Sequence, residues 1–422
     1  MPHPMTLSDS ETGPRWSIRL ILICLAAVSV SLPIAWISLA KILLVIAGLV
    51  YLVTDAVAGK PHFATTHSLT FKAILATLLA FFASLMWTSI GMDTALLALV
   101  KHAKLVVILL LIYLIRTRRE ARLGAIAYAG GQSFVLLSSW LLAAGASLPW
   151  VTDPNGKYVV FSSYLDQSIM LATTAAVLWH LRQENLWPRW IAGLLAAAAL
   201  LNTVLLLDGR TGYVVAIAML SLAVMWAMPK RFRAIALLAA PILALTVMYW
   251  GSSNVQERVS RIFKESQSYS QQAETQTSSG WRLNAWQRSI AAIRESPWHG
   301  HGVGSWAITV KRLQGDSATQ TFGEGDASNP HQEYLLWGVE LGAGGSLLFI
   351  AVLLAMALDA RRFTPPVQRA TWSVLTALAV ACMFNSTLYD DLIGDFFCVA
   401  LGLMMAMGFN GISPQHHSKV TA

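Results

Sequence analysis

The sequence predicts an all-α polytopic membrane protein with about 12 transmembrane helices and one long extracytoplasmic loop that contains short helices. Three observations support this prediction. Hydrophobic residues make up 55% of the chain and charged residues only 12%, and the mean hydropathy is +0.56. Soluble domains carry about 25% charged residues, and no soluble core needs this much apolar surface. The apolar residues also occur in runs of about 20, the length that crosses a bilayer as a helix.

These runs are distributed along the chain. Arg15 and Arg19 precede the first run, but no clean small-residue cleavage site follows it, so we expect a retained span and not a signal peptide. In chain order, the predicted spans are Ile18 to Trp36, Ser38 to Val53, Phe71 to Ile90, Leu99 to Ile115, Leu123 to Leu148, Tyr164 to Leu181, Trp190 to Leu207, Thr211 to Met228, Ala234 to Trp250, Tyr334 to Leu358, Ala370 to Thr387 and Leu392 to Phe409.

Basic residues between the spans predict the orientation. With the N-terminus in the cytoplasm, every basic cluster falls on the cytoplasmic side, as the positive-inside rule requires. The C-terminus is then cytoplasmic as well. The clusters are Arg116 to Arg122, Arg182 with Arg189, Lys230 to Arg233, and Arg361 to Arg369.

The same orientation places one long segment outside and divides the chain into three parts. Residues 1–250 hold about nine spans, residues 251–330 form the loop, and residues 331–422 hold about three spans and a cytoplasmic tail. A connection of about 80 residues is far longer than usual, so we expect it to be functional. Its apolar periodicity predicts helices at 255–263 and 283–294.

The charge pattern argues against nucleic-acid binding, and the cysteine content argues against a disulfide or a cysteine metal site. The net charge of +8 comes from short clusters between apolar spans, which indicates topology and not a nucleic-acid-binding face. Cys24, Cys382 and Cys398 all lie in apolar spans without a C-x-x-C pair, so they are expected to pack and not to form a disulfide or metal site.

The stretch Asn329-Pro330-His331-Gln332 opens the apolar helix predicted from Tyr334 to about Leu358. Asn329 can cap that helix, Pro330 suits its first turn, and Gln332 stands where a capping-box partner belongs. We therefore expect His331 at a helix N-terminus.

On a helical period of 3.6 residues, His331 falls on a face whose other residues are mostly glycines, so that face carries few side chains. Two interpretations are open: a polar helix start whose glycines serve helix packing, or an imidazole that a bulky partner can approach closely. The residues of this face are His331, Leu335, Gly338, Gly342 and Gly345.

Arg210 stands at the outer boundary of two apolar spans, beside Asp208 and before Thr211. From the residues alone it could pair with Asp208, reach toward the interface, or bind a ligand. Lys101 and Lys104 lie at the outer end of the fourth predicted span, where charges usually anchor a helix to the interface. Asp390 and Asp391 lie at the outer end of the eleventh and allow the same interpretation.

The sequence predicts neither a metal nor a cofactor. His299 and His301 lack a third ligand at a usual zinc spacing. The glycine repeat from Gly300 to Gly304 could cradle a phosphate, but no strand precedes it, so a tight turn that packs the loop is favoured. Glu324 and Asp326 resemble the carboxylate pair of metal-dependent glycosyltransferases, although a solvated turn is more usual in such a glycine-rich loop.

Two motifs resemble a known family. His331-Gln332, nine residues, and then Gly342-Ala343-Gly344-Gly345 resemble the His-[Asn/Ser/Gln]-x9-Gly-x-x-Gly signature of the O-antigen ligase family, relatives of the O-antigen polymerases. The run Arg282 to Trp286, followed by Pro297 and by Gly300, Gly302 and Gly304, is similar to the family's preceding segment. The resemblance spans Gly280 to Gly345, and Trp306 stands where the family more often has Phe.

The resemblance implies an enzyme of lipopolysaccharide biosynthesis in the bacterial inner membrane, with its active site on the periplasmic side. Its reaction would move an O-antigen glycan from undecaprenyl diphosphate to a sugar hydroxyl of lipid A-core oligosaccharide. The diphosphate serves as leaving group, so no nucleotide is needed, and the chain has no Walker motif.

The resemblance also implies roles for single residues. His331 would be the general base, with Gln332, Gly342 and Gly345 completing its motif. Arg210, in the motif-like run Gly209-Arg210-Thr211-Gly212, and Arg282 would bind the diphosphate, although Asp208-Gly209 replaces the serine often seen before that arginine. Arg288, Lys101 and Lys104 are further candidates for the same ligand.

Three alternatives stay open. An O-antigen polymerase would use a second lipid-linked glycan as acceptor, and a protein O-oligosaccharyltransferase would use a serine or threonine. The long loop between the ninth and tenth predicted spans favours the ligase. A transporter of lipid-linked glycans belongs to a different class. It would be expected to carry mid-span charges and broken helices in two repeated halves, which this sequence does not show convincingly.

Overall fold

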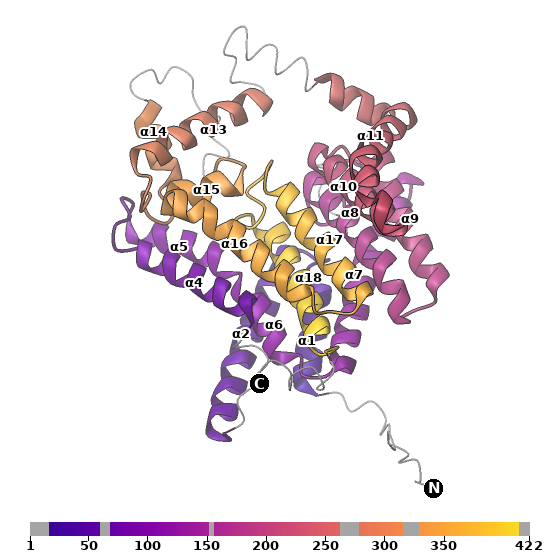
Figure 1. The fold of residues 1–422 in the computed structure, drawn as a ribbon, viewed down its shortest axis with the longest axis horizontal. Coiled ribbons are helices and arrows are strands. Elements are labelled where there is room, and N and C mark those ends of the chain that lie inside the picture. The colour runs from indigo at the N-terminus through magenta and orange to yellow at the C-terminus, as the bar shows by residue number, and fades with distance from the viewer. Residues whose placement is uncertain (1–16, 60–67, 152–155, 262–277, 315–328, 413–422) are drawn as a thin grey trace.

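The computed structural model describes residues 17–59, 68–151, 156–261, 278–314 and 329–412, and all regular secondary structure in these ranges is helical. Helices α13 and α14 lie across one end of the bundle, above α15 (Figure 1). The helices are α1 (Ile18–Ser29), α2 (Ile34–Val57), α4 (Leu69–Ser84), α5 (Met92–Ala103), α6 (Val106–Leu114), α7 (Arg118–Ala143), α8 (Tyr164–Leu181), α9 (Arg189–Leu205), α10 (Arg210–Ala227), α11 (Arg233–Gly251), α13 (Ser278–Glu295), α14 (Trp306–Gln314), α15 (Glu333–Leu341), α16 (Ala343–Ala360), α17 (Pro365–Ala381) and α18 (Asp391–Phe409).

The predicted all-α class is confirmed, and six described helical segments are long and apolar enough to cross a membrane. The bent pair α5 and α6, at 41° to each other, makes a seventh if it counts as one span. Helices α1, α4 and α9 are apolar but shorter. The total of about twelve spans stays a prediction. The six segments are α2, α7, α10, Lys230–Gly251, α16 and α18.

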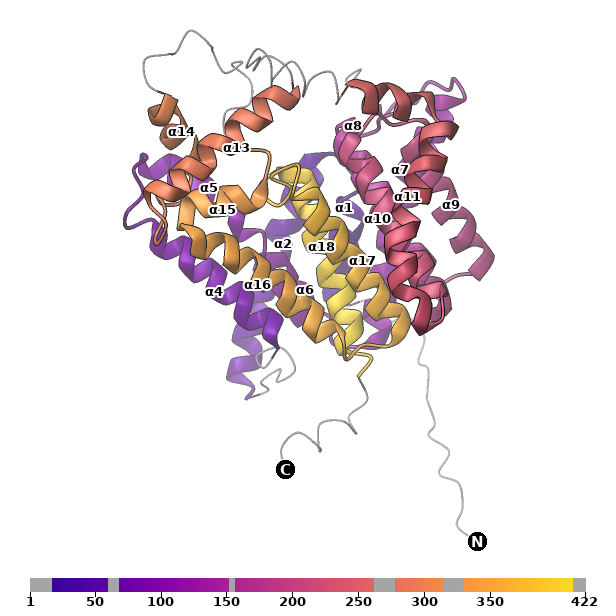
Figure 2. The same ribbon diagram turned by 45° about the horizontal axis from the view of Figure 1, so that its top comes forward.

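Helix α18 forms the centre of the bundle. Its 18-residue apolar window is 89% buried, whereas only 11% of the corresponding window of Lys230–Gly251 is buried. Helix α18 packs against α6, α7 and α17, and Figure 2 shows it among the other helices. Apolar side chains that α11 leaves exposed, such as Leu238 and Ile242, suit contact with lipid.

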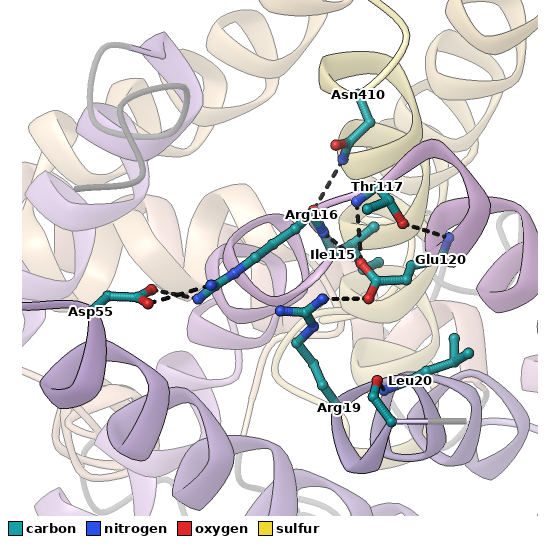
Figure 3. A network of polar contacts seen from close by, with 9 residues as sticks. Arg19, Leu20, Asp55, Ile115, Arg116, Thr117, Glu120 and Asn410 are labelled. Atoms are coloured by element: carbon teal, nitrogen blue, oxygen red, sulfur yellow. Dashed lines mark hydrogen bonds and ion pairs between the residues drawn. The ribbon is translucent and has the colours of Figure 1, made fainter. Parts of the chain in front are cut away.

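One end of α18 is fixed by a polar network that Figure 3 shows in close-up. Arg19 of α1 pairs with Glu120 of α7, and Arg116 pairs with Asp55 of α2. Asn410, just after α18, donates from Nδ2 to the Ile115 carbonyl (3.0 Å). The network therefore ties α1, α2, α7 and the end of α18 together. It includes Arg116, from one of the predicted cytoplasmic clusters.

The predicted continuous helix from Tyr334 to Leu358 is wrong, because the chain forms α15 and α16 with a break at Gly342. Gly342 has φ +74°, a backbone conformation that favours glycine. The predicted span from Leu99 to Ile115 is broken as well, between α5 and α6. Within residues 251–330, α13 confirms the helix predicted at 283–294, and residues 253–261 are helical where 255–263 was predicted.

The predicted cap and helix face are also corrected. Gln332, and not Asn329, is the N-cap of α15, and its side chain accepts the N–H of Leu335 at 2.6 Å. His331 has φ +48°, so it lies outside the helix. It therefore does not share a continuous helix face with Gly342 and Gly345.

Candidate functional site

Three parts of the sequence meet at the connection between α17 and α18, residues 382–390. Asn385 accepts a hydrogen bond at Oδ1 from Nη2 of Arg282 (3.4 Å) and donates from Nδ2 to Oγ1 of Thr211 (3.1 Å). Next to it, Oγ of Ser386 accepts the backbone N–H of Gln332 (3.2 Å). The connection therefore joins α10, α13 and the segment that leads into α15.

Both arginines that the sequence singled out make contacts at this junction. Arg210 is the first residue of α10, and its Nη1 donates to Oγ of Ser279 at 3.0 Å. Ser279 lies in the first turn of α13, three residues before Arg282. Both arginines are half-buried. Asp208, the local partner considered for Arg210, forms an ion pair with Arg258 at 3.4 Å.

His331 lies beside the same part of α13. Its ring and that of Trp281 form a T-shaped pair with centroids 5.1 Å apart. The His331 backbone N–H donates to Oδ1 of Asn329 at 2.9 Å, and Nε1 of Trp286 donates to the Pro330 carbonyl at 3.0 Å. A non-glycine residue with φ +48° is uncommon and costs on the order of 1 kcal/mol. In this conformation the imidazole lies against Trp281, near the start of α13.

The motif glycines permit close packing between helices and loop. A Cβ on Gly342 would lie 2.6 Å from the Pro297 carbonyl oxygen, and a Cβ on Gly345 would lie 2.2 Å from the Trp337 carbonyl oxygen. Gly300 has φ +65°, and its Cβ would lie 2.4 Å from the Gly342 nitrogen. The glycine repeat therefore forms the predicted tight turn, packed where α15 meets α16.

The further candidates occupy different positions around the junction. Lys104 is buried, donating to the Asp390 carbonyl at 2.7 Å and pairing with Asp391 at 3.9 Å. Lys101 places its ammonium over the Tyr389 ring, 4.4 Å from the centroid. Both lysines thus contact the connection 382–390 or its continuation into α18. Arg288 is half-buried on α13.

Sequence reasoning missed a buried polar cluster on α15. Glu333 is fully buried, and its Oε2 accepts the N–H groups of Leu388 (3.0 Å) and Tyr389 (3.3 Å). Seven residues further along α15, Glu340 forms a buried pair with His102. The distance between Oε2 of Glu340 and Nε2 of His102 is 2.8 Å. Two acids seven residues apart in an apolar helix were the signal that could have revealed this cluster.

The described ranges contain no group of three or more His, Cys, Asp or Glu side chains that could hold a metal ion. Glu324 and Asp326 lie outside the described residues. The arrangement offers two guanidinium groups and one imidazole at a single junction. Guanidinium groups suit phosphate oxygens, and imidazole is the side chain most often used for proton transfer.

Two comparisons with known proteins gave different results. A search of curated proteins found no match. The family model for O-antigen ligase matches residues 195–350, which contain Arg210, Arg282, His331 and both motif glycines. This match supports placing the chain in an O-antigen ligase-type family.

Proposed function

We propose that this protein is an O-antigen ligase. It would transfer O-antigen glycan from undecaprenyl diphosphate to a sugar hydroxyl of lipid A-core oligosaccharide, at the periplasmic face of the bacterial inner membrane. The observation that supports this most strongly is the junction that brings Arg210, Arg282 and the His331 segment together. The family match over the same residues supports it independently.

The proposed chemistry is a displacement at the anomeric carbon. The acceptor hydroxyl oxygen forms the new glycosidic bond, while the bond from that carbon to the diphosphate breaks and its electron pair leaves with the diphosphate. Arg210 and Arg282 would bind the diphosphate and stabilise the charge that develops on it. Their charge does not titrate away, and their fork geometry matches phosphate oxygens.

His331 would take the proton of the acceptor hydroxyl. Its contact with Trp281 supports this role, because the ring is held next to the helix that carries Arg282. No nucleotide or metal takes part in the proposed reaction. The donor already contains the activated bond, and the diphosphate is both membrane anchor and leaving group.

The proposed topology places this junction outside. Residues 251–330 would cover the active site between the N-terminal and C-terminal membrane parts, and both termini would be cytoplasmic. The Arg116 network supports this arrangement, because it lies near Asn410, at the opposite end of α18 from residues 382–390. A helix of that length separates the two by about 28 Å.

A reconstituted transfer reaction tests the proposal. The purified full chain in detergent would receive lipid-linked glycan and lipid A-core oligosaccharide without nucleotide or metal. We expect glycan to appear on lipid A-core. Product only with a second lipid-linked glycan would identify a polymerase, and product only on serine or threonine would identify a protein O-oligosaccharyltransferase. Movement of the donor across vesicles without any product would identify a transporter.

A further inference from the structure

Asn385 occupies a position between the two proposed diphosphate-binding regions. Its side chain is buried, at 2% exposure, and contacts Arg282 of α13 with one end and Thr211 of α10 with the other. The residue before Thr211 is Arg210. A single amide therefore links the helix that carries one arginine to the helix that begins with the other.

The chemistry of the amide determines its orientation. A guanidinium only donates hydrogen bonds, so the amide oxygen must face Arg282, and the NH₂ group is then directed to the Thr211 hydroxyl. The reverse orientation would bring two donors together. A carboxylate in this place could still accept from Arg282, but it would bring a negative charge to the guanidinium. Asparagine accepts a hydrogen bond from the arginine without itself bringing a negative charge to it.

The connection that carries Asn385 is itself held firmly. Ser386 accepts from the Gln332 backbone, Glu333 accepts from the Leu388 and Tyr389 backbone, and Lys104 donates to the Asp390 carbonyl. It leads directly into α18, the most buried of the candidate spans. An arginine side chain loses about 2 kcal/mol of rotamer entropy when it is ordered, so a rigid acceptor favours one position of its fork in advance.

We propose that Asn385 is the positioning residue for the donor diphosphate. It holds the Arg282 guanidinium against the start of α10, so that the guanidinium groups of Arg282 and Arg210 address one diphosphate together. This inference rests on the proposed function. It adds a residue whose effect on the donor passes through Arg282.

The test compares binding of undecaprenyl diphosphate to the purified full chain and its variants. We expect Asn385→Ala to weaken binding about fivefold, because one charge-assisted hydrogen bond is lost. Asn385→Asp should weaken it more, by about tenfold or above, because the carboxylate competes with the phosphate for Arg282. Thr387→Val is the matched control, since Thr387 is buried in the same connection. It should bind like wild type.

A double-substitution experiment separates positioning from a merely structural role. If Asn385 acts through Arg282, adding Asn385→Ala to Arg282→Lys should weaken binding by less than about twofold beyond Arg282→Lys alone. Full additivity of the two effects would overturn the inference. Thr211→Val tests the same link without touching Asn385, in case Asn385→Ala does not fold, and about threefold weaker binding is expected.

The remaining outcomes distinguish this inference from the proposed function. The inference alone is overturned if the wild-type protein binds undecaprenyl diphosphate and the variants Asn385→Ala, Asn385→Asp and Thr211→Val bind it equally well. Wild-type protein that does not bind undecaprenyl diphosphate would overturn the proposed function, and the inference with it.

Discussion

Trp281 and His331 form a T-shaped ring pair, with centroids 5.1 Å apart and an interplanar angle of 67°. Trp281 directly precedes Arg282 in α13, and Arg282 contacts Asn385. At the start of α13, Trp281 therefore contacts the proposed base His331, and the next residue, Arg282, contacts the amide of Asn385. The placement of α13 controls how the proposed base and the proposed phosphate-binding group lie relative to each other.

Loss of the Trp281 ring should slow glycan transfer. An aromatic pair contributes about 0.5–1.5 kcal/mol, so Trp281→Ala should lower kcat about three- to tenfold if that contact orients the imidazole. Trp281→Phe keeps a ring and should lose less than about threefold. Trp298→Ala is the control, because Trp298 is 89% exposed. A Trp281→Ala enzyme with the kcat of wild type would show that the ring pair does not orient His331.

The conformation of Gly342 predicts a stability difference between two neighbouring glycines. Gly342→Ala should destabilise the protein by about 1–3 kcal/mol, because φ is +74° and the new Cβ would meet the Pro297 carbonyl. Gly344→Ala should be neutral or slightly stabilising, since that position is exposed and nothing lies within 4 Å of its Cβ. Thermal unfolding in detergent measures both variants. Equal midpoints would contradict the strain assigned to Gly342.

The fold class and several helix positions could be predicted from local sequence. The apolar run Tyr164 to Leu181 is found as α8 with the same bounds, and the apolar period predicted most of α13. The break at Gly342 could not be predicted this way. A glycine inside an apolar run is compatible with a helix, and here the Pro297 carbonyl, 45 residues earlier in the chain, packs against the turn.

The site was also only partly predictable, because some of its residues stand in local motifs and others are defined by long-range contacts. Arg210, Arg282 and His331 stand in motifs that resemble a family, so their residue types and order were visible in the sequence. Asn385 was not, because its importance comes from contacts with Arg282 and Thr211, which are 103 and 174 positions away. No local pattern around Asn385 encodes such contacts.

Lysine should not replace the two arginines if they bind a diphosphate through two hydrogen bonds each. Arg210→Lys and Arg282→Lys keep the charge but lose the fork, so each should lower kcat/KM at least about tenfold, or about 1.4 kcal/mol. Binding of undecaprenyl diphosphate should weaken in parallel. If Arg210 only reached toward the interface, lysine would serve equally well. Wild-type rates in both variants would redirect the search for the phosphate ligand to Lys101, Lys104 or Arg288.

Chelation should leave transfer unchanged. The proposed reaction uses guanidinium groups and an imidazole where a metal-dependent glycosyltransferase uses a cation. The measurement is the transfer rate before and after incubation with EDTA. Loss of activity that Mg²⁺ or Mn²⁺ restores would contradict this prediction and direct attention to Glu324 and Asp326.

The most direct measurement compares His331→Ala with wild type in the reconstituted transfer reaction, with donor binding measured on the same samples. Loss of the general base should slow transfer about 10²- to 10⁴-fold. Undecaprenyl diphosphate binding and thermal unfolding should stay close to wild type, because the proposed phosphate ligands are Arg210 and Arg282. A His331→Ala protein that keeps more than half of the wild-type transfer rate would remove His331 from the mechanism and contradict the proposed active site.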